Sequence, residues 1–300
     1  MSSESFDDIK EKITSAAFGK NGYCFLLIDS SLKQYQSDAF LYDILKGYES
    51  YSVTFHQSEL QGALPLSLFP LKMFSERDAQ LLNNSIYHSL KELKSEKLDS
   101  GEGRSVCAWI STALTGELLA EQIALFAVQS IQSVGNILLR YFDPSVFGPL
   151  MSFLDSWQRQ QLLSNIDTWC YLDGDGVAQT VNGDGECKKK LNYSLGLTES
   201  NLSEMHRISI INNILRVYRK MNVADKLRER EAVNLLRSAL DYYSSFSPSI
   251  NDIIEFGLEI LLTQRRFYQD GIFEKNTLHN RIKNLQLYSD AKFGIKSQDC

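Results

Sequence analysis

Apolar and polar positions form two kinds of pattern in the first half of the chain. Three stretches have apolar residues every three or four positions and begin at Ser or Thr, which predicts helices at 37–47, 75–97 and 115–130. Shorter runs, rich in apolar and β-branched residues and bounded by Gly, Ser or Asp, predict buried strands. These runs are YCFLLID (23–29), YSVTF (51–55), SVCAWIS (105–111) and NILLRYF (136–142). The alternation of strands and helices indicates an α/β lobe whose mostly parallel or mixed sheet is covered by helices.

One segment of this half follows neither pattern. GALPLSLFPLKMF (62–74) has two prolines five positions apart, Pro65 and Pro70. Proline interrupts a regular helix and is unfavourable in a central strand. We therefore expect an extended edge segment that leads into the helix beginning near Ser75.

The second half of the chain is predominantly helical. A short helix is expected at 156–163, and DTWCYLDGDGVAQTVNGDGEC (167–187) predicts a hairpin, because two runs flank a turn rich in Gly and Asp. Apolar spacing then predicts helices at 198–221, 223–245, 249–268 and 274–289. We expect an α/β lobe over residues 1–190 and a mainly α-helical C-terminal lobe over 191–300.

Composition narrows the class of protein. A hydrophobic content of 43% with 23% charged residues is ordinary for a globular protein, and a net charge of -6 argues against nucleic acid as a partner. The five cysteines are scattered and none forms a Cys-x-x-Cys pair, which argues against a disulfide framework or a zinc ribbon and fits a reducing cytoplasm. The sequence has no secretory signal pattern and no apolar run of about 18 residues, so we expect a soluble intracellular protein without a membrane partner.

Motifs of common enzymes are missing from the sequence. It contains no H-E-x-x-H, G-x-S-x-G or phosphate-loop pattern. The four histidines, His56, His88, His206 and His279, stand far apart, which suits surface positions or satisfied core positions. We therefore predict no catalytic residue, no cofactor and no metal ligand.

One enzymatic alternative stays open. Glu186 and Lys188 form the E-x-K half of a metal-dependent nuclease site, with Asp173 as a possible second ligand. Such a site needs two carboxylates that converge on Mg²⁺ and a lysine that polarises the attacking water. E-x-K is a very common triplet, and no convincing basic surface for the substrate accompanies it.

The stretch NILLRYFDPSVFGPLMSFL (136–154) places a lone arginine among apolar residues. If Arg140 is buried it needs a partner, and Asp143 is a candidate. Asp143 can equally cap the helix that follows, with Pro144 at its first position, where the missing N–H is harmless. The stretch then combines a strand, a cap and a helix, and requires no reaction.

These residues resemble the type VI secretion effector adaptors, also called effector chaperones. Arg140, Tyr141, Phe142, Asp143 and Pro144 are similar to the family's signature, Arg-Phe/Tyr-Tyr/Phe-Asp-Pro-Arg at the end of a strand, although Ser145 replaces the final Arg. Three further stretches resemble the family's opening strand ending in Asp, its Pro-containing segment, and the strand and helix before the signature. They are YCFLLIDSSL, LPLSLFPL and VCAWISTALTGELLAEQIALFAV, so that the resemblance covers about residues 20–175.

The resemblance implies a non-enzymatic adaptor in the bacterial cytoplasm. Its partners would be a toxic effector protein and the valine-glycine-repeat spike protein, onto which it loads the effector. The five signature residues would form a structural corner rather than an active site. A generic intracellular scaffold unrelated to secretion is a second alternative to this function.

Overall fold

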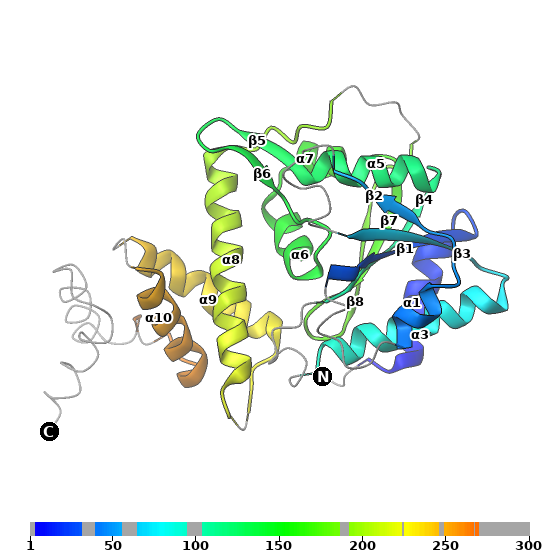
Figure 1. The fold of residues 1–300 in the computed structure, drawn as a ribbon. Helices are drawn as coiled ribbons and strands as arrows, with labels where there is room; N and C mark the ends of the chain where they lie inside the picture. Colours follow the sequence, from blue (N-terminus) through cyan, green and yellow to red (C-terminus); the bar gives the residue numbers. More distant parts are fainter. Residues whose placement is uncertain are drawn as a thin grey trace, which may run out of the picture. The chain divides into compact units, whose positions relative to one another are not determined.

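The computed structural model describes residues 4–31, 40–55, 65–94, 104–186, 192–223, 225–245, 249–266 and 268–269 of the 300-residue chain. The chain divides into two compact units, residues 1–204 and 205–300. In the described ranges, the first unit combines strands with helices and the second contains helices only (Figure 1). The prediction of an α/β part followed by a helical part is confirmed at this level.

Six strands of the first unit form one sheet in the order β2-β3-β1-β4-β7-β8. Every neighbouring pair in this sheet is antiparallel, so the prediction of a mostly parallel or mixed sheet is wrong. The strands are β1 (Tyr23–Asp29), β2 (Tyr51–Val53), β3 (Leu66–Lys72), β4 (Val106–Thr112), β7 (Ile166–Leu172) and β8 (Ala178–Asn182).

The predicted sheet differs from the observed one in which strands are neighbours and in the direction of β4, which runs antiparallel to β1. Strands β1 and β2 run the same way, because each is antiparallel to β3. Strands β3 and β4 also run the same way, because each is antiparallel to β1. Helix α2 (Phe40–Leu45) lies between the first pair in the chain and α3 (Glu76–Glu92) between the second, as expected of helical crossovers. An antiparallel strand is inserted between the members of each pair.

The inserted strand β3 is the segment with two prolines, which we expected at an edge. It lies between β2 and β1, so that expectation is wrong. Strand β2 pairs only with Leu66–Leu68, however, and Pro70 pairs with Phe25 of β1 beyond the end of β2. Proline is tolerated there because its missing N–H can face the open side of the strand. Helix α3 begins where expected, since the Ser75 side chain accepts a hydrogen bond from the Asp78 amide.

The strand predicted at 136–142 is shorter than expected and belongs elsewhere. Helix α5 (Gly116–Ala127) is followed directly by β5 (Val128–Ile131), which pairs with β6 (Gly135–Leu138) in a separate two-stranded sheet. Gly135 has a φ of 77°, a left-handed conformation that glycine adopts without strain at the turn between these strands. The predicted strand therefore ends before Arg140.

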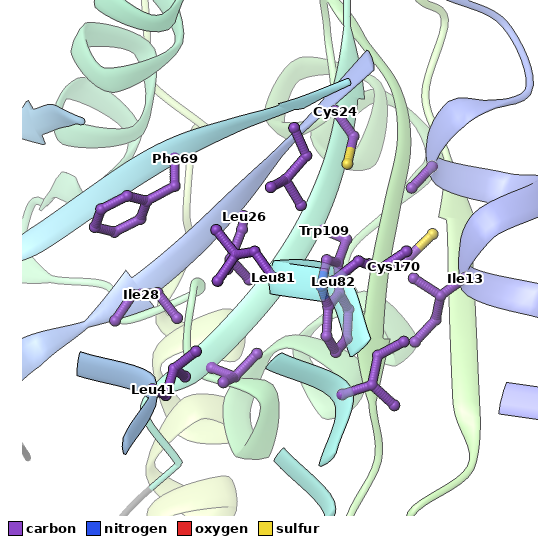
Figure 2. Close-up of a cluster of buried hydrophobic side chains, with 14 of the residues drawn as sticks. Ile13, Cys24, Leu26, Ile28, Leu41, Phe69, Leu81, Leu82, Trp109 and Cys170 are labelled. Atoms are coloured by element: carbon purple, nitrogen blue, oxygen red, sulfur yellow. The ribbon is translucent and has the colours of Figure 1, made fainter. Parts of the chain in front are cut away.

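Helices cover both faces of the six-stranded sheet (Figure 1). On one face, α1 (Phe6–Phe18), α2 and α3 contribute to a buried hydrophobic cluster. Figure 2 shows Cys24, Leu26 and Ile28 of β1 in this cluster, together with residues of α1 and α3. Because side chains alternate along a strand, Asp29 at the end of β1 faces the other side. That side carries α5 and α6 (Pro144–Phe153).

The end of the first unit agrees with the sequence pattern. Helix α7 (Ser156–Leu162) occupies the predicted position, and Asp155 and Gln158 form a capping box at its start. Strands β7 and β8 form the predicted hairpin. Gly176 has a φ of 76° in the turn between them.

The described part of the second unit contains three helices, the first of which begins a few residues before the unit. They are α8 (Glu199–Lys220), α9 (Glu229–Ser244) and α10 (Ile250–Thr263), which confirms the helices expected at 198–221, 223–245 and 249–268. Helices α8 and α10 pack closely, because a Cβ atom at Gly257 would lie 2.5 Å from Cδ1 of Ile214. The helix predicted at 274–289 lies outside the described residues. No helix in the described ranges is both long and apolar enough to cross a bilayer.

Candidate functional site

Arg140 forms an ion pair with Asp29, the last residue of β1. Nη2 of Arg140 lies 3.1 Å from Oδ2 of Asp29, whose side chain is 2% exposed. The other carboxylate oxygen of Asp29 accepts hydrogen bonds from the amide of Ser31 at 3.0 Å and from its hydroxyl at 2.6 Å. A buried carboxylate is stable when it is paired and its remaining lone pairs are satisfied. Both conditions hold for Asp29.

The guanidinium of Arg140 is less buried than its partner. The Arg140 side chain is 39% exposed, and its Cζ lies 5.5 Å from the centre of the Phe142 ring. Contact with an aromatic face stabilises a guanidinium by about 0.5–1 kcal/mol at a partly exposed site. The Arg140 guanidinium therefore contacts both the buried carboxylate of Asp29 and the ring of Phe142.

Asp143 caps helix α6 and does not neutralise Arg140. Its Oδ1 accepts hydrogen bonds from the amide of Ser145 at 2.9 Å and from the hydroxyl of the same residue at 2.6 Å. Pro144 is the first helical residue. Of the two roles considered for Asp143, the cap is confirmed and the ion pair with Arg140 is wrong. The reason is that the end of β1 brings Asp29 closer to the guanidinium.

The two aromatic residues of the signature are buried against the sheet. Tyr141 is 1% exposed and Phe142 is 0% exposed. The Tyr141 ring lies 5.7 Å from the ring of Trp169 in β7, and Phe147 of α6 stacks on the same tryptophan at 5.0 Å. Burial raises the pKa of the Tyr141 hydroxyl well above its ordinary value, so it is uncharged at neutral pH. The signature residues therefore form a packed corner.

A buried polar cluster that the sequence analysis missed lies at the start of β4. One Glu92 oxygen accepts hydrogen bonds from the Ser105 amide at 2.9 Å and from its hydroxyl at 2.5 Å, and the other lies 3.4 Å from the Val106 amide. His88 places Nε2 3.3 Å from Glu92 and 3.5 Å from the Ser105 hydroxyl. The sequence contains no sign of the cluster, because Glu92 and Ser105 are 13 residues apart and a glutamate at the end of a helix is typical of the surface.

The cluster combines the residue types of a hydrolytic triad but lacks the geometry of one. In a triad the histidine bridges the serine and the carboxylate with two different ring nitrogens. Here one nitrogen of His88 faces both groups, and the Ser105 hydroxyl donates to Glu92 directly. The cluster therefore has a structural role, in which Glu92 accepts the hydrogen bonds of the amides at the start of β4. Of the other histidines, His206 lies on α8, while His56 and His279 lie outside the described residues.

Cys107 of β4 is a buried cysteine whose thiol is affected by the charges of the corner. Burial raises the pKa of its thiol well above the ordinary value, and the carboxylates of Asp29, Asp143 and Glu92 raise it further, whereas Arg140 lowers it. Only the thiolate is a strong nucleophile. Cys107 is therefore an inert core residue at neutral pH.

The structure separates the carboxylates of the alternative nuclease site. Asp173 accepts hydrogen bonds from the amides of Asp175 and Val177, both at 3.0 Å, in the turn of the hairpin. Glu186 lies near the opposite end, where the Gly185 amide donates to the Ile166 carbonyl at 3.0 Å. At about 3.3 Å per residue, the length of β7 places them roughly 20 Å apart. They cannot share one ion, and Lys188 lies outside the described residues.

The described ranges contain no group of three or more His, Cys, Asp or Glu side chains that could hold a metal ion. No protein-family model matches the chain, and no curated protein or solved structure matches it either.

Proposed function

We propose that this chain is an adaptor of the type VI secretion apparatus. It binds a toxic effector in the bacterial cytoplasm and loads it onto the valine-glycine-repeat spike protein, without catalysing a reaction itself. In this function the five residues from Arg140 to Pro144 keep the α/β unit in shape and contact neither partner directly.

The observation that carries the proposal is the ion pair between Arg140 and Asp29. Two of the four stretches that resemble the family are an opening strand that ends in Asp and a signature that begins with Arg. These stretches are 111 residues apart at the two paired positions, and their polar residues meet in one contact. A long-range contact of this kind explains why both stretches would appear together in one family. It supports a shared fold more directly than a shared partner.

We further propose that the two units have different tasks. The α/β unit, which contains the family-like stretches, docks on the spike protein. The helical unit has its own buried core and lies beyond the resemblance, so it selects the effector. Helices α8 and α9 of this unit contain several Tyr and Arg residues, which are residue types enriched in protein interfaces.

Co-purification tests the proposal. The full chain, with an affinity tag, is expressed together with the proteins encoded by the genes beside its own. We expect neighbouring genes for a spike protein and a toxin, and we expect both products to elute with the tagged chain. Neighbours of neither kind, together with no stable complex, would favour a generic scaffold. Nuclease activity that disappears in the double variant Glu186→Gln, Lys188→Ala would favour the enzymatic alternative.

A further inference from the structure

Strand β8 leaves backbone groups open at the edge of the six-stranded sheet. It pairs with β7 on one side, and no strand in the described ranges pairs with its other side. The Asp173 amide donates to the Val177 carbonyl and the Gly183 amide to the Asp167 carbonyl, each at 3.0 Å. In an antiparallel ladder the direction of these groups alternates from residue to residue. The N–H and C=O groups of Ala178, Thr180 and Asn182 therefore point away from β7.

The sequence of β8 lacks the features that usually protect an edge strand. Proteins block such edges with charged side chains, proline or bulges, because an open edge pairs readily with another chain. Ala178–Asn182 reads AQTVN, with no charge and no proline, and the paired positions run without a register shift. The opposite edge strand, β2, is only three residues long. β8 is therefore the edge better suited to binding another strand.

A groove lies along this edge, between β8 and helix α1. Its volume is about 700 Å³, and its lining residues are Glu4, Asp8, Glu11, Lys12, Ser15, Ala16, Ala178 and Thr180. Helix α1 is held beside the hairpin, because the Thr168 hydroxyl donates to the Ala16 carbonyl at 2.8 Å. Ala178 and Thr180 both line the groove, as expected of alternate residues on one face of a strand.

The wall of the groove formed by α1 is acidic. The lining has three carboxylates, Glu4, Asp8 and Glu11, but one lysine, Lys12, which pairs with Glu4, so the lining carries a net negative charge. Hydrogen bonds from the side chain and backbone of Ser5 lower the pKa of Asp8, so its carboxylate is charged at neutral pH. The groove therefore favours a positively charged occupant.

One contact illustrates how the edge can be bound. The Ala178 amide, which points away from β7, lies 3.5 Å from Oε2 of Glu4. The carboxylate oxygen of Glu4 thus takes the place that a backbone carbonyl would have in an added strand. Thr180 and Asn182 point the same way farther along the edge.

We propose that the edge of β8 binds an extended segment of a partner protein with Lys or Arg at alternate positions. Backbone hydrogen bonds to Thr180 and Asn182 supply affinity, as in other proteins that bind a peptide by strand addition. The basic side chains of every second residue face Asp8 and Glu11 and supply selectivity. This inference goes beyond the adaptor function, which assigns a partner to each unit but names no surface, and it does not depend on which partner carries the basic segment.

Fluorescence anisotropy with the full chain tests the charge preference. The probe is a labelled ten-residue peptide in which Lys and Thr alternate, and the control peptide has Glu in place of Lys. We expect the basic peptide to bind at least about tenfold more tightly, and 0.5 M salt to reduce this difference. Equal affinity of the two peptides, or no binding of the basic one, would overturn the proposal.

N-methylated forms of the basic peptide test the strand pairing without altering the protein. Methylation of every second amide removes the donors that face β8, whereas methylation of the intervening amides leaves these donors intact. One of the two forms should therefore bind like the parent peptide and the other at least about tenfold more weakly. Equal binding by the two forms would exclude strand addition.

Variants of the chain locate the site. Glu11→Lys should weaken binding of the basic peptide about fivefold, since one attractive charge becomes repulsive. Thr180→Pro removes an outward N–H that makes no bond to β7, and should weaken binding of both peptides. The matched control is Glu49→Lys, an exposed glutamate outside the groove lining, which should bind like the parent. If Glu11→Lys and Glu49→Lys behave alike, the groove is not the site.

Discussion

Arg140 donates a hydrogen bond of 3.1 Å to the carboxylate of Asp29, which precedes it by 111 residues. The contact ties the end of β1 to the corner that leads into α6. Because the Asp29 side chain is 2% exposed, the arginine provides the counter-charge for a carboxylate that water barely reaches. The corner is therefore a long-range link within the α/β unit.

Arg140→Ala should lower the free energy of unfolding by about 2–3 kcal/mol, because it leaves a buried carboxylate without its counter-charge. The loss is at the low end for a buried pair, since Arg140 is itself 39% exposed. Urea denaturation followed by circular dichroism measures the change. The control Arg159→Ala removes an exposed arginine of α7 and should change stability by less than about 0.5 kcal/mol. Equal effects of the two substitutions would contradict a stabilising ion pair.

Asp143→Ala should lower the free energy of unfolding by about 1 kcal/mol, the usual effect of losing a helix N-cap. Asp143→Asn should be nearly neutral, because asparagine caps a helix as well as aspartate does. The same denaturation curves measure both variants. If the asparagine variant loses as much stability as the alanine variant, then the charge of Asp143 matters and the capping role is insufficient.

Glu92→Ala should lower the free energy of unfolding by about 3 kcal/mol, because buried donors of Ser105 and Val106 lose their acceptor. Thermal unfolding monitored by circular dichroism is a suitable measurement. Glu49→Ala is the matched control, since Glu49 is exposed. A Glu92 variant as stable as this control would mean that the cluster does not support β4.

The buried cysteines should be unreactive in the folded protein. Burial raises the pKa of the Cys24 and Cys107 thiols well above the ordinary value, and that of Cys170 to about 11. In a chain carrying Cys187→Ser and Cys300→Ser, Ellman's reagent at pH 8 should therefore detect almost no thiol until denaturant is added. Rapid modification of a thiol in the folded state would contradict this burial.

The same shifts predict loss of stability in alkali. A thiol whose pKa is raised in the folded state contributes stability that is complete below the unfolded pKa, about 8.5, and is lost as pH rises through the folded value. For Cys170 the window extends from about pH 8.5 to about 11. Melting temperatures should fall across this range, and less steeply in Cys170→Ala. A flat profile in both proteins would contradict the prediction.

The local structure of the corner could be predicted from the sequence, whereas the long-range partner of Arg140 could not. Asp143 and Pro144 stand in the order of a cap and a first helical residue, and both are found in these roles. The partner of Arg140 depends on how β1 approaches the corner, which hydrophobic spacing does not encode. The proximity of Asp143 in sequence favoured the wrong carboxylate.

For the fold as well, the sequence predicted local elements but not which of them lie side by side. Short apolar runs identified β1, β4 and β7, which are buried along most of their length, and periodicity identified most helices, because each helix buries one face. It did not identify β3 as an internal strand, since a proline there is acceptable only where β2 has already ended. The insertion of β3 separates β1 from β2, which run in the same direction, and the pattern of a single strand cannot reveal which strand lies beside it.

We propose that the chain delivers a toxin to the secretion spike, and a secretion assay tests this function. The proposed function predicts a toxin gene beside that of the chain. Its product is measured in culture supernatants of the parent strain, of a strain without the chain, and of that strain with the chain restored. We predict that the toxin disappears from the supernatant when the chain is absent, returns when it is restored, and that other cargo of the apparatus is unaffected. Undiminished secretion of the toxin without the chain would contradict the claim.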